Sequence, residues 1–264
     1  MQSFDLIGVG APIVDSLARV PDSFLDKAGG AKGGMELIDS ETMSALMGGI
    51  NSALVEAPGG SAGNTVQAAS RLGLRSTFLG KLGNNKDADF YRDNFRKMGV
   101  DVSRFKTGGL PNARCLSLVT PDSQRTMRTD LGASKTLSPD EITEADFAGC
   151  RHAHLEGYLL FNKELTLQLL RSATKAGCTI SLDLGSFEVV RASRDILEEI
   201  LRGYVTVVFS NEDEAAAFTG LKDGYEAMAN RLGTLCPVSV VKLGKEGALV
   251  HDKSGLTWID PVTV

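Results

Sequence analysis

Acidic, amide and glycine residues stand where they could hold hydroxyl groups. The segment FDLIGVGAPIVD runs from an apolar, strand-like stretch into a loop that ends at Asp15. Loops that follow parallel strands are common ligand sites, and an ionised carboxylate there can accept hydrogen bonds from two neighbouring hydroxyls of a sugar. A solvated turn residue is the alternative interpretation of Asp15.

A second segment, APGGSAGNTVQAASRLG, places Gly59 and Gly60 directly before a helix expected over 62–72. Without a Cβ atom, such a pair can serve a turn or let a ligand approach the main chain. Asn64 falls in the first turn of that helix, where its amide could donate to and accept from a substrate hydroxyl. Taken alone, this segment favours a simple turn followed by an ordinary early-helix asparagine.

Two later segments could hold phosphates. Asn211 and Glu214 have the spacing of a helix-capping box, and the same placement would aim an amide and an acid at the sheet edge, toward the water shell of Mg²⁺. In PVSVVKLGKEGALVHD a strand turns back through 244–247. This segment is either a plain hairpin or a nucleotide loop with Lys242 or Gly244 near phosphate or ribose.

Other chemistries are disfavoured. A dinucleotide fingerprint from Gly8 and Gly10 would lack its third glycine, because Ile13 stands there. Neither a Walker P-loop nor a Gly-x-Ser-x-Gly elbow is present. His152 and His154 alternate on an expected strand as some metal ligands do, but without a third ligand strand packing is favoured.

The elements that must position these residues alternate between strands and helices. Apolar, strand-length runs begin near residues 4, 76, 115, 152, 178, 204 and 237, and helical patterns cover 62–72, 89–98 and 163–176. This alternation predicts an α/β fold with a mainly parallel central sheet flanked by helices. Residues 16–38 and 113–129 interrupt it with short strands and turns, which we expect to form a small separate sheet.

Composition narrows the class of protein. The 264 residues are 42% hydrophobic and 23% charged with a net charge of -5, values typical of a water-soluble protein. No stretch is long enough for a membrane span, no basic stripe suits nucleic acid, and no secretion signal is recognisable, so we expect a cytoplasmic protein with a small-molecule partner. The four cysteines contain no CxxC pair, which argues against a zinc site.

Taken in order, these segments resemble the phosphofructokinase B (PfkB), or ribokinase-like, family of carbohydrate and nucleoside kinases. GVGAPIVD looks like the family's opening strand and loop, GGSAGNTVQAASRLG like its first signature, NEDE at 211–214 like its Asn-x-x-Glu motif, and VVKLGKEGALV like its nucleotide loop. The resemblance spans the chain and implies one domain over 1–264. It also implies a small β-sheet lid, with lid strands within about 16–38 and 113–129.

The resemblance implies an enzyme that phosphorylates a primary hydroxyl with ATP and Mg²⁺. The residues that it assigns to the substrate hydroxyls are Asp15, Gly59, Gly60 and Asn64. Those that it assigns to the nucleotide and its phosphates are Asn211, Glu214, Lys242, Gly244 and Gly247, with Glu214 acting on the metal through water. Arg125 stands where some members place an anion-contacting arginine, and a solvated arginine is the alternative.

The family's second signature supplies an anion hole and the Asp that acts on the attacking hydroxyl. The chain ends at WIDPVTV before that signature. Asp260 comes too early to be its Asp, and Asp183 matches a different strand-end acid. We therefore expect a C-terminally incomplete domain whose catalytic residue lies beyond Val264. A non-catalytic sugar- or nucleoside-binding protein that lacks this Asp is the alternative.

The substrate is resolved only to a nucleoside or a ribose-like sugar. KGGMELID and the Gly-Gly-Ser start of the signature, with Ser61, resemble the adenosine-kinase-like branch. Ala11 stands where adenosine kinases usually carry Asn, which argues against adenosine itself. Exposed lid strands would also allow two copies to pair as a homodimer.

Overall fold

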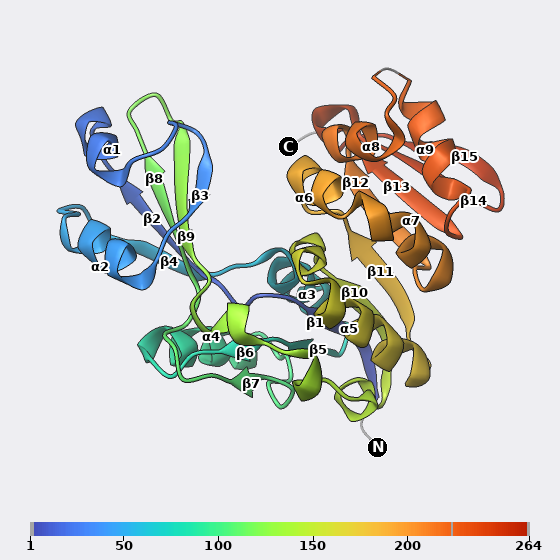
Figure 1. The fold of residues 1–264 in the computed structure, drawn as a ribbon, viewed down its shortest axis with the longest axis horizontal. Coiled ribbons are helices and arrows are strands. Elements are labelled where there is room, and N and C mark those ends of the chain that lie inside the picture. Colours follow the sequence, from blue (N-terminus) through green and yellow to red (C-terminus); the bar gives the residue numbers. More distant parts are fainter. Residues whose placement is uncertain (1–2, 223, 263–264) are drawn as a thin grey trace. The chain divides into compact units, whose positions relative to one another are not determined.

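The computed structural model describes residues 3–222 and 224–262. The chain divides into two compact units (Figure 1). The first unit consists of Met1–Gly10 and Ser138–Val264, and the second of Ala11–Leu137. No described helix is long and apolar enough to cross a membrane.

The first unit is organised around a mixed sheet with the strand order β15-β14-β13-β12-β11-β10-β1. In this sheet β1, β10, β11, β12 and β13 pair in parallel, and β14 and β15 add an antiparallel edge. The strands are β1 (Phe4–Val9), β10 (Cys150–Leu155), β11 (Thr179–Asp183), β12 (Val207–Asn211), β13 (Val238–Lys242), β14 (Ala248–Asp252) and β15 (Gly255–Ile259).

Helices connect these parallel strands, as a parallel sheet requires. They are α5 (Lys163–Lys175), α6 (Phe187–Ala192), α7 (Arg194–Gly203), α8 (Glu212–Thr219) and α9 (Tyr225–Gly233). Short 3-10 turns cover Pro139–Glu141, Glu144–Phe147, Gly157–Phe161 and Gly244–Glu246. The longest helix, α5, begins where the Asn162 side chain accepts from the Leu165 N–H, and it buries Leu165, Leu169 and Leu170.

The second unit contains a separate sheet with the order β3-β9-β8-β2-β4. Its strands are β2 (Val14–Arg19), β3 (Met35–Leu37), β4 (Val55–Pro58), β8 (Arg114–Val119) and β9 (Arg125–Asp130). Along β2, Ser16 and Ala18 are buried on one face, while Asp15 and Leu17 are half-buried on the other. Period-two alternation therefore places Asp15 on the face opposite the packed core.

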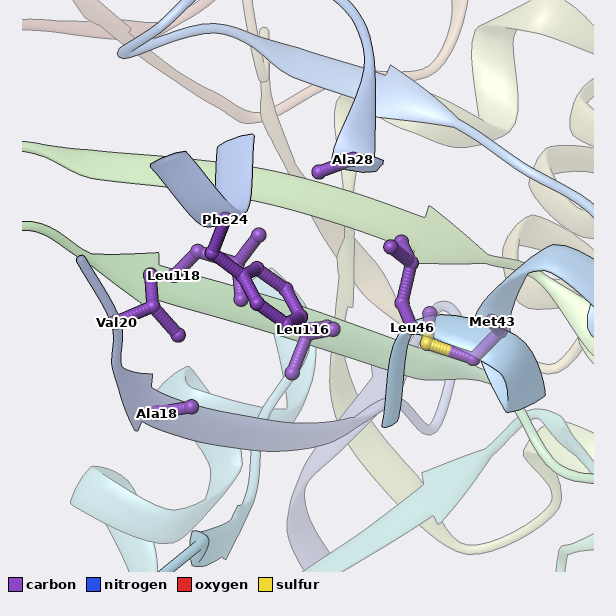
Figure 2. Close-up of a cluster of buried hydrophobic side chains, with 8 residues drawn as sticks. All are labelled: Ala18, Val20, Phe24, Ala28, Met43, Leu46, Leu116 and Leu118. Carbon is purple, nitrogen blue, oxygen red and sulfur yellow. The ribbon is translucent and has the colours of Figure 1, made fainter. Parts of the chain in front are cut away.

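That core lies against two short helices, α1 (Asp22–Ala28) and α2 (Ser40–Gly48). Figure 2 shows Phe24 of α1 beside Leu116 and Leu118 of β8, and Leu46 of α2 belongs to the same buried cluster. Full burial of one such side chain is worth about 1.5–3 kcal/mol, so this cluster holds the helices on the sheet.

The rest of the second unit surrounds two longer helices, α3 (Ser61–Arg71) and α4 (Lys86–Lys97). The remaining elements are β5 (Ser76–Leu79), β6 (Lys81–Leu82), β7 (Lys106–Thr107) and a 3-10 turn over Gly132–Thr136. Four aromatic rings pack together here, with centroids 4.4–6.3 Å apart: Phe78, Tyr91, Phe95 and Phe105. This contact joins α4 to β5.

The predicted fold class is confirmed, with a mainly parallel sheet, flanking helices and a smaller second sheet. Some boundaries were wrong. The apolar run expected near 204 becomes a strand only at Val207, because Tyr204 caps the end of α7. The run that begins at residue 152 ends as a strand at Leu155 and continues as a 3-10 turn.

Within 16–38 the chain forms a short helix, α1, beside strands β2 and β3, while 113–129 contributes β8 and most of β9. Helix α2 and strand β4 were not predicted from the sequence. A single domain over 1–264 stays a prediction, and Val264 lies outside the described residues.

Candidate functional site

The Gly59–Gly60 turn lies directly beside Asp15. Strands β2 and β4 are antiparallel with Asp15 opposite Ala57, and the Gly59 N–H donates to the Ile13 carbonyl at 2.8 Å. A Cβ atom at residue 59 would overlap the Asp15 carboxylate. The pair therefore does more than turn the chain, because the missing side chain is what lets the carboxylate lie against the main chain.

Gly60 then starts α3 in a conformation that favours glycine. Its φ is 85°, and a Cβ atom would overlap the Ala11 carbonyl oxygen. The Gly60 carbonyl accepts from the Asn64 N–H at 2.8 Å. The Asn64 side chain is exposed one turn into the helix and has no hydrogen-bond partner among the described residues. Its amide is free to meet a hydroxyl group.

Burial and a nearby cation act in opposite directions on Asp15. Desolvation raises the pKa of its carboxyl above the ordinary value of 3.8, and the charge of Arg125 partly lowers it. Arg125 lies on β9 and donates to the Ser117 hydroxyl at 3.1 Å. The register partner of Asp15 on β8 is Cys115, whose thiol pKa is raised by burial and further by the Asp15 charge. The thiol is therefore a neutral neighbour at physiological pH.

Asn211 and Glu214 form the capping box that their spacing predicted. The Asn211 side-chain oxygen accepts from the Glu214 N–H at 2.8 Å, and the Glu214 carboxylate accepts from the Asn211 N–H at 2.9 Å. Glu214 is buried at the start of α8, and this burial raises the pKa of its carboxyl, with Asp183 and Asp213 adding to the rise. A cation near this group would favour its charged form.

Lys242 ends β13 and points toward a neighbouring strand end. Its ammonium nitrogen lies 2.9 Å from the Asp183 carboxylate, whose other oxygen accepts from the Gly185 N–H at 2.9 Å. This pair is partly exposed on the lysine side, so solvent screening limits what it adds to stability. An exposed ammonium group beside a sheet edge suits phosphate binding.

The segment after Lys242 is the hairpin that the sequence predicted, with a 3-10 turn between β13 and β14. Gly244 has open space around its Cα, which leaves its backbone accessible. At Gly247, by contrast, a Cβ atom would overlap the Ile259 carbonyl of β15. Packing of this edge strand is enough to explain the glycine at 247.

Three residues that were not selected from the sequence lie close to candidate segments. Glu156 follows β10 and is buried, and its carboxylate fills the space that a side chain at Gly10 would need. Tyr91 and Arg114, in the second unit, bond to the strands and the turn around Asp15. The one available sequence signal was for Glu156, an acid directly after a buried strand.

The two histidines of β10 have ordinary hydrogen-bond partners. His152 and His154 both bond to the Ser181 hydroxyl at 2.8 Å, and desolvation lowers the pKa of His154 to about 4. Among the described residues, no group of three His, Cys, Asp or Glu side chains could hold a metal directly. The hydrogen bonds of both rings to Ser181 agree with strand packing of the pair.

Mg²⁺ usually keeps several waters and binds one or two carboxylates together with substrate phosphates. Asp183 lies close enough to Glu214 for its charge to raise the pKa of the Glu214 carboxyl. This donor set fits a hydrated Mg²⁺ held through water. It does not fit a closed cage of protein ligands.

The candidate residues fall into two groups along the chain. Those considered for substrate hydroxyls all belong to Ala11–Leu137, and those considered for nucleotide all belong to Ser138–Val264. Within its own unit, each group lies at a helix start or a strand end.

Comparison with known proteins identifies related sequences. A model of the pfkB family of carbohydrate kinases matches residues 37–263. Guanosine-inosine kinase of Escherichia coli K12 is 27% identical over 231 residues, which are 83% of this chain and 53% of that protein. Adenosine kinase of Saccharomyces cerevisiae is 26% identical over 81% of this chain and 65% of its own length.

The similar solved structures are also those of kinases. Adenosine kinase from Sinorhizobium meliloti matches with a TM-score of 0.87 and 30% identity, covering 100% of this chain and 81% of that one. A probable sugar kinase from Rhizobium etli CFN 42 matches with a TM-score of 0.86 and 30% identity. In the sequence comparison, this chain spans about half the length of the curated kinase from E. coli K12.

Proposed function

This chain belongs to the pfkB family of carbohydrate kinases, and from that premise we propose that it serves to transfer the γ-phosphoryl group of ATP to a primary hydroxyl of a sugar or nucleoside. Related kinases act on guanosine and inosine, on adenosine or on sugars, according to their names. Each of these substrates carries neighbouring hydroxyl groups.

One observation carries the proposal, namely the Asp15 carboxylate lying against the glycine backbone at the start of α3. The carboxylate accepts hydrogen bonds, while backbone N–H groups at a helix start can donate them. A vicinal diol needs both kinds of partner. Asn64 adds a group that can do either.

In the proposed reaction the substrate hydroxyl oxygen bonds to the γ-phosphorus as the bond to the β,γ-bridging oxygen breaks. ADP leaves, and the hydroxyl proton passes to a base. We propose that this base is the Asp of the family's C-terminal signature. By holding the neighbouring hydroxyls, Asp15 and Asn64 would orient the substrate so that its primary hydroxyl faces the γ-phosphorus, and such positioning lowers the barrier of phosphoryl transfer.

On the nucleotide side, Lys242 and the open backbone at Gly244 would contact phosphate or ribose, with Asn211 and Gly247 shaping the same edge. Asp183 and Glu214 would hold the water shell of Mg²⁺. When bound, Mg²⁺ neutralises charge on the β- and γ-phosphates. We assign Arg125 to an anion near Asp15, because its guanidinium is exposed on that face.

The test is ADP formation from ATP by the protein at its natural length, with adenosine, guanosine, inosine, ribose and fructose as acceptors. We expect turnover with at least one acceptor and its loss without Mg²⁺. Absence of turnover with every acceptor would contradict the kinase proposal. Binding of an acceptor without turnover would instead support a non-catalytic sugar- or nucleoside-binding protein.

We also propose that two copies pair through the second unit. The edge strands β3 and β4 carry exposed apolar side chains, with Leu37 63% and Val55 64% exposed. Unpaired edges of this kind can extend a sheet from one chain to another. Sedimentation velocity at several protein concentrations distinguishes a dimer from a monomer at all concentrations.

A further inference from the structure

Tyr91 connects α4 to the turn beside Asp15. Its side chain is fully buried, and its hydroxyl donates to the Gly59 carbonyl oxygen at 3.0 Å. The ring stacks on Phe95 with centroids 4.4 Å apart and contacts Phe78 and Phe105. Because the ring is packed on several sides, the position of its hydroxyl is fixed.

This bond sets the orientation of the next peptide. The described residues contain no cis peptide bond, so the Gly59 C=O and the Gly60 N–H point in opposite directions across a planar trans amide. With the carbonyl held by Tyr91, the Gly60 N–H faces away from the buried ring. The structure gives that N–H no acceptor among the described residues, and Gly60 is half-exposed.

A second contact holds α4 itself. Asp87 lies one turn before Tyr91 and accepts from the Arg114 guanidinium of β8. The same guanidinium donates to Ser16 of β2 and to Glu56 of β4. The strands that carry Asp15 and lead to Gly59 are thereby bonded to the helix that carries Tyr91.

We propose that Tyr91 is a positioning residue for the substrate site, fixing the Gly59–Gly60 peptide so that the Gly60 N–H donates to a substrate hydroxyl. This inference rests on the proposed function of the Asp15 site. Without the tyrosine hydroxyl the peptide can rotate, since glycine at both positions opposes rotation little. The donor would then be presented to the substrate for only part of the time.

The test compares Tyr91→Phe with Ser239→Ala in the protein at its natural length. Ser239 is a matched control, because its buried hydroxyl also donates to a backbone carbonyl, that of Ala229, at 2.8 Å. Each variant loses one bond of the same kind and keeps the surrounding packing. Thermal unfolding verifies that both variants fold.

For Tyr91→Phe we expect the KM of the acceptor that the wild type uses best to rise about fivefold, the equivalent of one ordinary hydrogen bond. The KM of ATP should stay unchanged, and Ser239→Ala should change neither. If Tyr91→Phe lowered stability, as Ser239→Ala does, but left both KM values unchanged, the role of Tyr91 would be purely structural and the inference would be overturned.

Acceptors that lack one hydroxyl sharpen the result. With a nucleoside acceptor, the 2′-deoxy or the 3′-deoxy analogue should be used equally well by wild type and Tyr91→Phe, because one of these analogues lacks the hydroxyl that the Gly60 N–H would bind. An unchanged fivefold difference with both analogues would overturn the inference while leaving the proposed function intact. Failure of the wild type to use any acceptor would instead remove the proposed function and, with it, this role.

Discussion

Asp15 is a carboxylate that the fold holds partly away from water, and this has opposite consequences for binding and for stability. We expect Asp15→Asn to weaken acceptor binding about ten- to a hundredfold, since hydrogen bonds to a charged group are worth roughly 1.5–3 kcal/mol. Isothermal titration with the preferred acceptor measures this loss. An equal loss of affinity and of folding stability would favour a purely structural role for Asp15 in β2.

The stability of the same variant should depend on pH in a defined direction. Burial raises the folded-state pKa of Asp15, so its contribution to stability is greatest below the ordinary value of 3.8 and is lost as pH rises through the raised value. At neutral pH, Asp15→Asn should therefore unfold at the same temperature as wild type or higher. This difference should shrink as the pH is lowered and the carboxyl is neutralised.

Gly59 offers a test of the close approach itself. A Cβ atom at this position overlaps the Asp15 carboxylate, so Gly59→Ala should displace that side chain and weaken acceptor binding at least tenfold. Gly48→Ala is the matched control, because a Cβ atom there meets nothing within 4 Å. Titration of both variants with the same acceptor compares them. Equal affinities would show that the close approach of Asp15 to Gly59 plays no part in acceptor binding.

At the scale of elements, the start of α8 combines a structural and a proposed functional role. Glu214→Gln should keep the cap, since an amide oxygen can still accept from the Asn211 N–H, while removing a buried charge. We expect affinity for ATP with Mg²⁺ to fall about tenfold with little loss of stability. Asp213→Asn, an exposed change of the same charge in the same turn, is the control.

Equal effects of the two substitutions would mean that only net charge near α8 matters, contrary to a specific role for Glu214. The affinities are measured by titration with a non-hydrolysable ATP analogue at a fixed Mg²⁺ concentration. Thermal unfolding of the same samples shows whether the cap persists.

Helices were predicted well from the sequence where capping residues and hydrophobic periodicity indicate the same boundaries. Asn211 and Glu214 indicated a helix cap that the structure contains. Gly73 and Gly177, which follow the expected helices, lie close to the observed ends of α3 and α5. β4 was missed because VEAP is short, carries one charged residue and ends in proline. Its strand character comes from pairing with β2, a contact that no local pattern encodes.

In the candidate site, too, single residues could be selected from the sequence, but their contacts could not. Asp15 and Gly59 were selected separately, but their contact depends on the register of β2 against β4. Tyr91 gave no signal, because a tyrosine inside a helical pattern is typical of a core position. Its bond to Gly59 arises only when α4 packs beside the turn. Tertiary contacts between distant segments are therefore what the sequence could not supply.

For the whole molecule, the decisive feature is that the two candidate groups belong to different compact units. Asp15 is surrounded by Gly59, Cys115 and Arg125 of its own unit, and Glu214 by Asn211 and Asp183 of the other. Substitutions at sites that share no partner usually have additive free energies. The binding of acceptor and the binding of nucleotide should thus be separable by mutation.

This separation is tested with Asp15→Asn, Glu214→Gln and the double variant. We expect Asp15→Asn to weaken acceptor binding without changing the affinity for the ATP analogue, and Glu214→Gln to do the reverse. In the double variant, the two losses in binding free energy should each equal those of the single variants within about 0.5 kcal/mol. A larger coupling, or loss of nucleotide affinity in Asp15→Asn alone, would show that acceptor and nucleotide binding depend on one shared conformational change.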